Sequence, residues 1–395
     1  MDEIYDVIIS GGGPSGSLLG FLLSSKNINT LIIEKEIFPR YKTCAGGIAH
    51  RTLKILPFNI EKVIEKNIYG IYFSQKIKDI CLKRYTEPII YTVDRKKFDF
   101  FIASKAKDSG CNFKFGEKVE GYDNTGNHII VKTDKNKYYA KVLAGADGTR
   151  GPVHRSIIGN ANIKKILGYE TEISLSNIDA AGRCQYPDEY RDKNENMFDF
   201  KDNIRLDFNG VRKGYCWVFP KKDHLSCGMG APSGYAKKMR NYFKSFLSDF
   251  YTGNGNKVAP GNLKINAQHI PVGDYKTPVC GYRVLTVGDA ACVGDGFTGE
   301  GLYNSFKSSF IASDSIAAAL TSSIFNFKDY ESKIRDNIFK DTKISLMFTK
   351  IFFDSLLFFY KLIKNNDNYF SACCKILRGE RTYKDVLDKL KIFKY

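Results

Sequence analysis

Hydrophobic positions near the start of the chain form two short apolar runs, separated by a segment with helical character. Residues 4–10 (IYDVIIS) are largely apolar and β-branched, which is typical of a parallel strand buried on both faces. Residues 17–25 are rich in leucine and favour a helix, and residues 30–33 (TLII) form a second apolar run that ends at Glu34. This order predicts the strand, helix and second strand that begin a doubly wound α/β domain.

The turn between the first strand and the helix carries candidate chemistry. Residues 11–16 (GGGPSG) match the pattern G-x-G-x-x-G. Gly11 permits the tight turn, Gly13 lets a pyrophosphate approach the backbone, and Gly16 lets the helix and strand pack closely. The helix N-terminus offers amide hydrogens and a positive dipole end to phosphates. Glu34 is placed to accept hydrogen bonds from an adenosine ribose, and an acid there favours FAD or NAD over NADP.

Two later apolar runs each end in a glycine and an aspartate. Residues 141–151 (KVLAGADGTRG) include Asp147, and residues 283–289 (RVLTVGD) close on Gly288 and Asp289. Asp-Gly is a common turn pair, so either run alone is compatible with an ordinary turn. Together with the N-terminal glycine turn, they predict one extended dinucleotide held at several points.

The later part of the chain changes character. Runs at 204–208 and 214–219 lie between Gly, Asn and Asp turns, as expected of an antiparallel sheet. Residues 326–395 have a mainly helical pattern, and within them residues 346–363 (LMFTKIFFDSLLFFYKLI) place charges at helical spacing among leucines and aromatics. That segment is either an interfacial helix that admits a lipid or a helix packed on the protein body. No stretch of about 18 uncharged apolar residues occurs, so no membrane-spanning helix is expected.

Composition narrows the function classes further. The 395 residues include 60 Lys and Arg against 43 Asp and Glu, and this formal charge of +17 favours anionic partners. A nucleic-acid partner is disfavoured, because neither a basic helix nor an aromatic RNA-binding pattern occurs. The ten cysteines include no C-x-x-C pair, and the five histidines have no metal-site spacing. We therefore expect reduced thiols and no metal site. The expected location is the cytoplasm, either free in it or peripherally attached to a membrane.

The combination of glycine turns resembles the flavoprotein class of para-hydroxybenzoate hydroxylase, which joins an N-terminal G-x-G-x-x-G, a central G-A-D-G and a late G-D-A-A. Three further segments are similar to the geranylgeranyl reductase family. Residues 38–47 (FPRYKTCAGG) resemble its P-x-x-K-x-C-x-G-G segment, and residues 215–221 (YCWVFPK) resemble its Y-x-W-x-F-P-K segment. Residues 94–99 (DRKKFD) resemble the start of its D-R-x-x-F-D helix. The resemblance extends from residue 7 to about residue 302.

This resemblance implies roles for individual residues. It implies that Cys44 and Lys42 are catalytic, with Cys44 tuning the flavin or donating a proton, and that Gly47, Tyr215, Trp217 and Phe219 bind the substrate. The side chains of the last three alternate along one strand and so share a face. The FAD-binding residues that it implies are Gly11, Gly13, Pro14, Ser15, Gly16, Glu34, Lys35, Cys44, Ala45, Gly46, Arg95, Asp147, Gly288, Asp289, Gly299, Gly301 and Leu302.

One segment departs from the family pattern. Where the family has G-D-A-A-G followed by a proline, this chain has Cys292 after Ala291 and Gly296 at the proline position. We expect a more flexible segment and a reshaped pocket there, which bears on substrate identity more than on FAD binding.

The resemblance implies an α/β fold with a Rossmann-type FAD-binding domain, an antiparallel substrate sheet and a helical C-terminal region. The expected boundaries are 1–58, 94–160 and 270–325 for the FAD domain, 59–93 and 161–269 for the substrate domain, and 326–395 for the helical region.

The implied function is an FAD-dependent reductase that saturates C=C bonds of an isoprenoid lipid or prenyl chain. No second G-x-G-x-x-G appears, so we expect no separate nicotinamide-binding domain. Electrons would come from NAD(P)H that binds transiently or from a ferredoxin-like protein. Two alternatives stay open: a flavin-dependent halogenase or monooxygenase acting on an aromatic substrate, and a non-catalytic protein that binds FAD or lipid.

Overall fold

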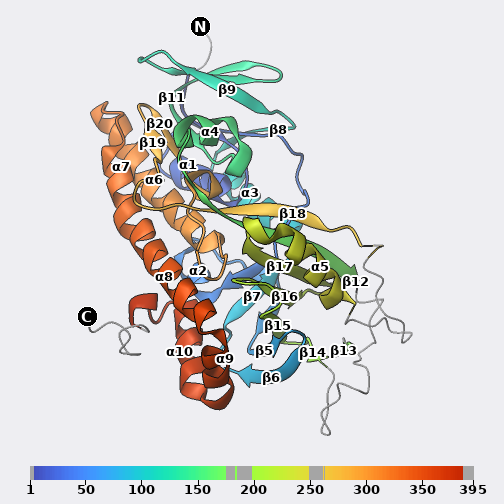
Figure 1. Cartoon of the computed structure of the whole chain (residues 1–395). Coiled ribbons are helices and arrows are strands. Elements are labelled where there is room, and N and C mark those ends of the chain that lie inside the picture. Colours follow the sequence, from blue (N-terminus) through green and yellow to red (C-terminus); the bar gives the residue numbers. More distant parts are fainter. Residues whose placement is uncertain (1–3, 175–182, 185–197, 249–260, 262, 386–395) are drawn as a thin grey trace, which may run out of the picture. The chain divides into compact units, whose positions relative to one another are not determined.

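The computed structural model describes residues 4–174, 183–184, 198–248, 261 and 263–385. The chain divides into two units, and each is assembled from three separated segments (Figure 1). Unit 1 comprises Met1–Lys42, Lys96–Lys164 and Ile270–Leu346. Unit 2 comprises Thr43–Arg95, Lys165–His269 and Met347–Tyr395. Parallel and antiparallel sheets occur together with C-terminal helices, which confirms the predicted α/β class.

Unit 1 is built on a sheet in the order β19-β20-β11-β1-β2-β8, with β10 and then β9 attached to β11. Strand β1 runs parallel to both β11 and β2, and β20 and β8 extend the parallel arrangement on either side. The strands of unit 1 are β1 (Ile4–Ser10), β2 (Thr30–Glu34), β8 (Asn112–Phe115), β9 (Val119–Asn124), β10 (Ile129–Thr133), β11 (Lys137–Gly145), β19 (Cys280–Gly281) and β20 (Val284–Thr286).

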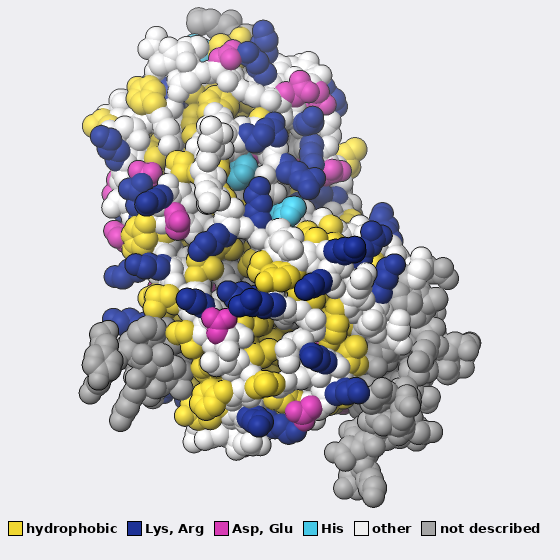
Figure 2. All heavy atoms as spheres, viewed as in Figure 1, with side chains coloured by type: hydrophobic (Ala, Val, Ile, Leu, Met, Phe, Trp, Pro, Cys, Tyr) yellow, Lys and Arg dark blue, Asp and Glu magenta, His cyan; other side chains and the backbone are white. Residues whose placement is uncertain are grey.

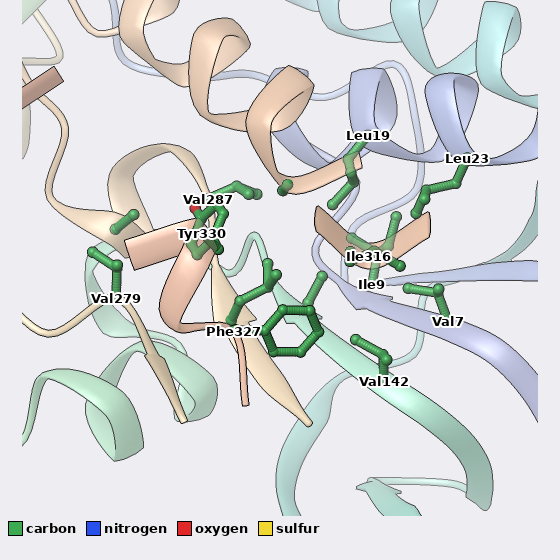
Figure 3. Packing of buried hydrophobic residues seen from close by; sticks show 14 of the residues in the cluster. Val7, Ile9, Leu19, Leu23, Val142, Val279, Val287, Ile316, Phe327 and Tyr330 are labelled. Carbon is green, nitrogen blue, oxygen red and sulfur yellow. The ribbon is translucent and has the colours of Figure 1, made fainter. Parts of the chain in front are cut away.

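Alternation along β1 explains how this sheet is covered on both faces. Val7 and Ile9 lie on one face in a fully buried cluster with Leu19 and Ile316 (Figure 3). Ile8 faces the other way, into a second buried cluster. The first face is covered by α1 (Pro14–Ser24), α3 (Arg95–Asp108), α6 (Leu302–Ser322) and α7 (Lys328–Ile334), and the second by α4 (Pro152–Ile158) with β9 and β10. A π-helical turn, Arg335–Phe339, follows α7.

Unit 2 is built on a sheet in the order β18-β12-β17-β16-β15-β5-β6, which is antiparallel except for the parallel pair β15–β5. A small sheet, β3-β7-β4, belongs to the same unit. The strands are β3 (Gly47–Ala49), β4 (Ile64–Ile68), β5 (Gly70–Gln75), β6 (Lys78–Arg84), β7 (Ile90–Val93), β12 (Lys164–Ser174), β13 (Arg183–Cys184), β14 (Phe198–Asp199), β15 (Asn203–Phe208), β16 (Tyr215–Pro220), β17 (His224–Pro232) and β18 (Asn266–Val272). The helices are α2 (His50–Ile55) and α5 (Ala236–Leu247).

The C-terminal helices do not form a separate region. Helix α8 (Lys340–Asp354) begins in unit 1 and ends in unit 2, and α9 (Leu356–Asn365) and α10 (Asp367–Leu377) belong to unit 2. The expected single helix over 346–363 is broken at Ser355, whose backbone leaves the helical region. Residues 386–395 of the expected helical region lie outside the described residues.

The domain boundaries differ from the expected ones in one more respect. Residues 43–58, expected in the FAD-binding domain, belong to unit 2, because β3 pairs with β7 in the small sheet. The divisions between the two units fall after residues 42, 95, 164, 269 and 346. No helix among the described residues is long and apolar enough to span a membrane.

Candidate functional site

The first two glycine turns of unit 1 meet at the carboxyl ends of neighbouring parallel strands. A Cβ atom on Gly11, which has φ +102°, would collide with the carbonyl oxygen of Ala146. A Cβ atom on Gly16 would collide with the carbonyl oxygen of Gly11 and lie 2.9 Å from Cβ of Ala146. Both glycines therefore allow the turn after β1 to pack against the turn after β11, in the place where α/β sheets bind dinucleotides.

The N-terminus of α1 faces this edge in a form suited to phosphate. No side chain caps the helix, Pro14 occupies its first turn, and that turn contains no acidic residue. A Cβ atom on Gly13 would meet nothing closer than Nη2 of Arg40, at 3.7 Å. Open space at Gly13, uncapped helix amides and a nearby guanidinium are the features that a pyrophosphate needs. The residues present thus fit the ADP half of FAD.

Glu34 is held at the end of β2 by two backbone hydrogen bonds. The Gly12 N–H donates to its Oε2 at 2.7 Å, and the Glu36 N–H donates to its Oε1 at 2.9 Å. The carboxylate is buried, with 5% of the residue exposed. Each carboxylate oxygen keeps a further lone pair for a ribose hydroxyl. Lys35, in contrast, is exposed and lies 3.9 Å from the Glu36 carboxylate.

The third glycine turn joins the same edge through α1. Gly288 has φ +62°, and a Cβ atom there would collide with the Ser15 hydroxyl. The Ser309 hydroxyl donates to the Ser15 carbonyl at 2.9 Å, and the Gly288 N–H donates to Ser308 Oγ at 3.0 Å. The three turns that are far apart in the sequence are therefore neighbours in unit 1.

The residues after this turn lead into α6 (Leu302–Ser322). Asp289 lies in a 3-10 turn, half-buried, with Oδ1 3.5 Å from the position that a Gly301 Cβ would occupy. Helix α6 starts at Leu302 with Gly301 as its N-cap, and Gly299 adopts φ +69° just before it.

Asp147 has a structural task that the sequence did not reveal. Its carboxylate accepts hydrogen bonds from the backbone N–H groups of Val153 at 2.8 Å and His154 at 3.3 Å, at the start of α4. Burial raises the pKa of Asp147 to about 6, against the lowering effect of these hydrogen bonds. Its expected contact with the dinucleotide stays a prediction. Arg95, the first residue of α3, is 8% exposed, and its expected contact with the flavin also stays a prediction.

Arg40 is a site residue to which sequence reasoning assigned no role. Its guanidinium forms an ion pair with the buried carboxylate of Asp99 at 3.0 Å and lies 4.8 Å from the ring centre of Phe38. These contacts hold the positive charge near Gly13. The signal was available, since Arg40 stands within residues 38–47 and Asp99 within the DRKKFD segment.

In unit 2, the segment from Cys44 to Gly47 contacts the end of β16. A Cβ atom on Gly47 would lie 2.5 Å from the Phe219 ring, so the glycine and the ring are in close contact. Gly46, with φ +65°, lies against the Val93 carbonyl and the Lys221 ammonium group. The Gly46 N–H donates to Cys44 Sγ at 3.4 Å. The two family segments that the sequence singled out are therefore neighbours within unit 2. Lys42 is the last residue of unit 1, and its role, like that of Cys44, stays a prediction.

The aromatic residues of β16 lie on the sheet face opposite the core of unit 2. Cys216 and Val218 are fully buried in a cluster with α5, whereas Tyr215 and Trp217 are half-buried on the other face. The ring centroids of Tyr215 and Trp217 lie 6.0 Å apart. The C-terminal helices cover part of this aromatic face, and the Phe208 ring lies 5.7 Å from the Phe352 ring. Period-two alternation predicted the shared face, while the helical cover was not visible in the sequence.

The segment that departs from the family pattern is anchored by specific hydrogen bonds. Cys292 adopts the left-handed conformation, with φ +59°, which explains why a glycine suits that position. The Gly296 N–H donates to Ser345 Oγ at 3.2 Å, and Asp295 Oδ1 accepts from the N–H groups of Phe297 and Thr298. The expected flexible segment is thus bonded to α8 by a donor that a proline would lack.

Comparisons with known proteins agree with this geometry. A family model described as an FAD binding domain matches residues 4–164. An uncharacterized protein of Methanosarcina barkeri is 31% identical over 91% of this chain and 86% of that protein. A digeranylgeranylglycerophospholipid reductase of Methanococcus vannielii is 28% identical over 94% of this chain and 90% of that protein. This chain belongs to the geranylgeranyl reductase family. The protein is therefore an FAD-dependent oxidoreductase, as the sequence predicted.

Solved structures support the fold of this family. A geranylgeranyl bacteriochlorophyll reductase-like protein from Thermoplasma acidophilum superposes with a TM-score of 0.78 at 19% identity, covering 99% of each chain. A flavin-dependent brominase superposes with a TM-score of 0.69, also at 19% identity, covering 98% of this chain and 99% of that one. At these identities the likeness concerns the fold alone, which reductases and halogenases share.

Proposed function

We propose that this member of the geranylgeranyl reductase family saturates C=C bonds in the isoprenoid chains of a lipid. The observation that carries the proposal is the contact of the Cys44–Gly47 segment with Phe219 in unit 2. It joins the two segments that resemble the reductase family into one surface. Relatives named digeranylgeranylglycerophospholipid reductase, such as that of Methanocaldococcus jannaschii at 26% identity, support a lipid substrate.

Reduction of an alkene needs a hydride at one carbon and a proton at the other. Bound FAD, once reduced, supplies the hydride. The chain must hold the alkene in a reactive position and offer a proton donor. Half-buried Tyr215 and Trp217 offer an apolar face for a prenyl chain, and Cys44 is the proposed proton donor.

The test uses protein whose flavin has been reduced chemically under anaerobic conditions. Mixing with a digeranylgeranyl glycerophospholipid should reoxidise the flavin, and the product mass should rise by two hydrogens for each bond. A matched lipid with saturated chains controls for reoxidation by traces of oxygen. A flavin that stays reduced with every isoprenoid lipid tried, and then reacts when oxygen is admitted, would favour the halogenase or monooxygenase alternative.

The halogenase alternative has less support from the residues of β16. Halogenases of this fold carry the pattern W-x-W-x-I-P, whereas this chain has Tyr215 in place of the first Trp and Phe219 in place of the Ile. Lys221 then follows Pro220 directly. A protein that binds FAD or lipid without catalysis would show flavin absorbance and bind the lipid, but would give no product mass change.

We also propose that the protein works at a membrane surface and takes electrons from NAD(P)H or a small ferredoxin-like protein. Leu357 and Phe358 of α9 are exposed by 58% and 61%, and exposed Lys350 and Lys361 flank them along the chain. Apolar residues flanked by lysines suit an anionic lipid surface. On the face shown in Figure 2, Lys and Arg side chains are scattered rather than gathered in one patch.

A further inference from the structure

Lys221 is a buried cation at the end of β16. It lies directly after Pro220, the last residue of the strand, and only 2% of it is exposed. An ammonium group in such surroundings is costly unless polar groups replace the water that it loses. The partners of Lys221 therefore indicate what the residue is for.

Those partners are backbone carbonyls of the Cys44 segment. The Lys221 Nζ donates to the carbonyl oxygen of Ala45 at 2.6 Å and to that of Gly46 at 3.2 Å. The Val93 N–H of β7 donates to the same Gly46 carbonyl at 2.9 Å. One ammonium group thus fixes two successive peptide units in the left-handed turn at Gly46, whose N–H donates to Cys44 Sγ.

Four groups of unit 2 favour the charged form of Lys221. They are the Cys44 sulfur, which contributes most, and the side chains of Glu65 in β4, Asp94 after β7 and Glu170 in β12. Burial outweighs them and lowers the pKa of Lys221 to about 8. The group therefore carries its charge at neutral pH and loses it in mildly alkaline solution.

We propose that Lys221 is a positioning residue for Cys44: it holds the Ala45–Gly46 turn in place and presents a buried positive charge to the cysteine sulfur. This inference deepens the proposed function, on which its catalytic meaning rests. When the Cys44 S–H bond breaks and its proton forms the new C–H bond, the electron pair stays on sulfur. The adjacent ammonium stabilises that thiolate until a proton from water restores the thiol.

The test measures the alkylation of Cys44 by iodoacetamide as a function of pH in the flavin-loaded protein, with the modified peptide quantified by mass spectrometry. In Lys221→Met, the pH of half-maximal alkylation should rise above the wild-type value, because an opposite charge that favours the thiolate is gone. Lys222→Met removes a charge from the exposed next residue and should leave this pH unchanged.

A second control separates charge from packing. The buried Thr92 hydroxyl of β7 donates to the Pro220 carbonyl at 2.7 Å, so Thr92→Val loosens the same strand end without removing the ammonium. Its alkylation midpoint should stay at the wild-type value even if its maximal rate changes. If Lys221→Met does not fold, Lys221→Gln keeps a donor for the carbonyls without the charge and should show the same rise.

The outcomes separate this proposal from the proposed function, because alkylation needs no substrate. An unchanged midpoint in both folded Lys221 variants overturns the positioning role, whatever the reductase assay shows. A raised midpoint in a protein that reduces no isoprenoid lipid keeps the positioning role and rejects the lipid reductase. If the positioning role and the lipid reductase both hold, kcat in Lys221→Met should fall at least tenfold. KM should change less than threefold, since Tyr215, Trp217 and Phe219 are unchanged.

Discussion

Gly13 and Gly16 lie three residues apart in the same turn, but they need glycine for different reasons. Gly16 packs against the Gly11 carbonyl, so a side chain there has no room within the protein. Gly13 has φ −64°, and a Cβ atom there would meet only Arg40, at 3.7 Å. Its side is open toward the position that a pyrophosphate would take.

This difference predicts opposite behaviour for two alanine substitutions. Gly13→Ala should keep its melting temperature within about 2 °C, because its backbone conformation suits alanine, but should weaken FAD binding by about tenfold or more. Gly16→Ala should lose about 3 kcal/mol or more of folding free energy through overpacking. Thermal unfolding and flavin titration measure both effects. Unchanged FAD affinity in Gly13→Ala would contradict the phosphate position.

Lys221 also predicts a pH dependence of stability. Its pKa is about 8 in the folded protein and 10.5 when unperturbed. Between these values the unfolded chain binds more protons, so this residue makes stability rise with pH, by about 3 kcal/mol in total. Chemical denaturation of Cys44→Ala, with and without Lys221→Met, at pH 7.5 and pH 10.5 measures it as the change in the difference between the two proteins. The Cys44→Ala background removes the thiol that is coupled to Lys221. A constant difference across this range would contradict the lowered pKa.

The residues that the sequence could predict are those whose role depends on local chain geometry. Gly11, Gly16 and Glu34 follow from the order of strand, turn and strand. The ion pair of Arg40 with Asp99 and the carbonyl contacts of Lys221 join segments that are far apart in the sequence, and no spacing rule connects them. Asp147 shows a second limit, because the Asp-Gly pattern indicates a turn without showing that the carboxylate caps α4.

At the scale of elements, the turn before α6 depends on α8. Gly296 donates to Ser345, and a Cβ atom on it would lie 2.6 Å from the Leu346 side chain. The departure from the family pattern at Gly296 is thus matched by the residues of α8 that pack on it.

Gly296→Pro, which restores the family residue, should therefore destabilise this protein. It removes the hydrogen bond to Ser345 and crowds Leu346, with an expected loss of about 2 to 4 kcal/mol. Ser345→Ala, which removes the hydrogen bond without the crowding, should lose about 1 kcal/mol. Urea denaturation measures both variants. A Gly296→Pro variant as stable as wild type would show that this segment tolerates the family conformation.

The elements that the sequence located well are those with strong periodicity. Strands β1, β2 and β15 match the expected runs within one residue, whereas α1 begins at Pro14, earlier than the expected residue 17. The earlier start is explained by Pro14, because proline is well suited to the first turn of a helix. Pro14 also belongs to the G-x-G-x-x-G pattern, and for that reason the sequence assigned it to the turn. The break at Ser355 was not predicted, because aromatic and leucine residues continue on both sides of it.

For the whole molecule, residues 346–363 pack in part on the protein body, and their interpretation as an interfacial helix stays a proposal. Phe348, Phe352 and Phe359 are buried in unit 2, so the segment packs on the protein body. Leu357 and Phe358 remain exposed on α9.

If α9 meets a membrane, the double variant Leu357→Ser and Phe358→Ser should bind anionic phospholipid vesicles at least about tenfold more weakly, because two apolar side chains no longer leave water. Ile324→Ser is the matched control, since Ile324 is 61% exposed but lies in unit 1. Vesicle sedimentation measures binding, and thermal unfolding should show both proteins folded. Equal binding by the double variant and wild type would reject α9 as the contact.

The interleaving of the two units has a consequence for how the protein is made. Strand β1 pairs with β11 and β11 pairs with β20, so the central sheet of unit 1 stays incomplete until residue 286 has left the ribosome. Unit 2 in turn needs the helices that follow residue 347. Nearly the whole chain must therefore be synthesised before either core closes, which prolongs the exposure of apolar strands to chaperones and to aggregation.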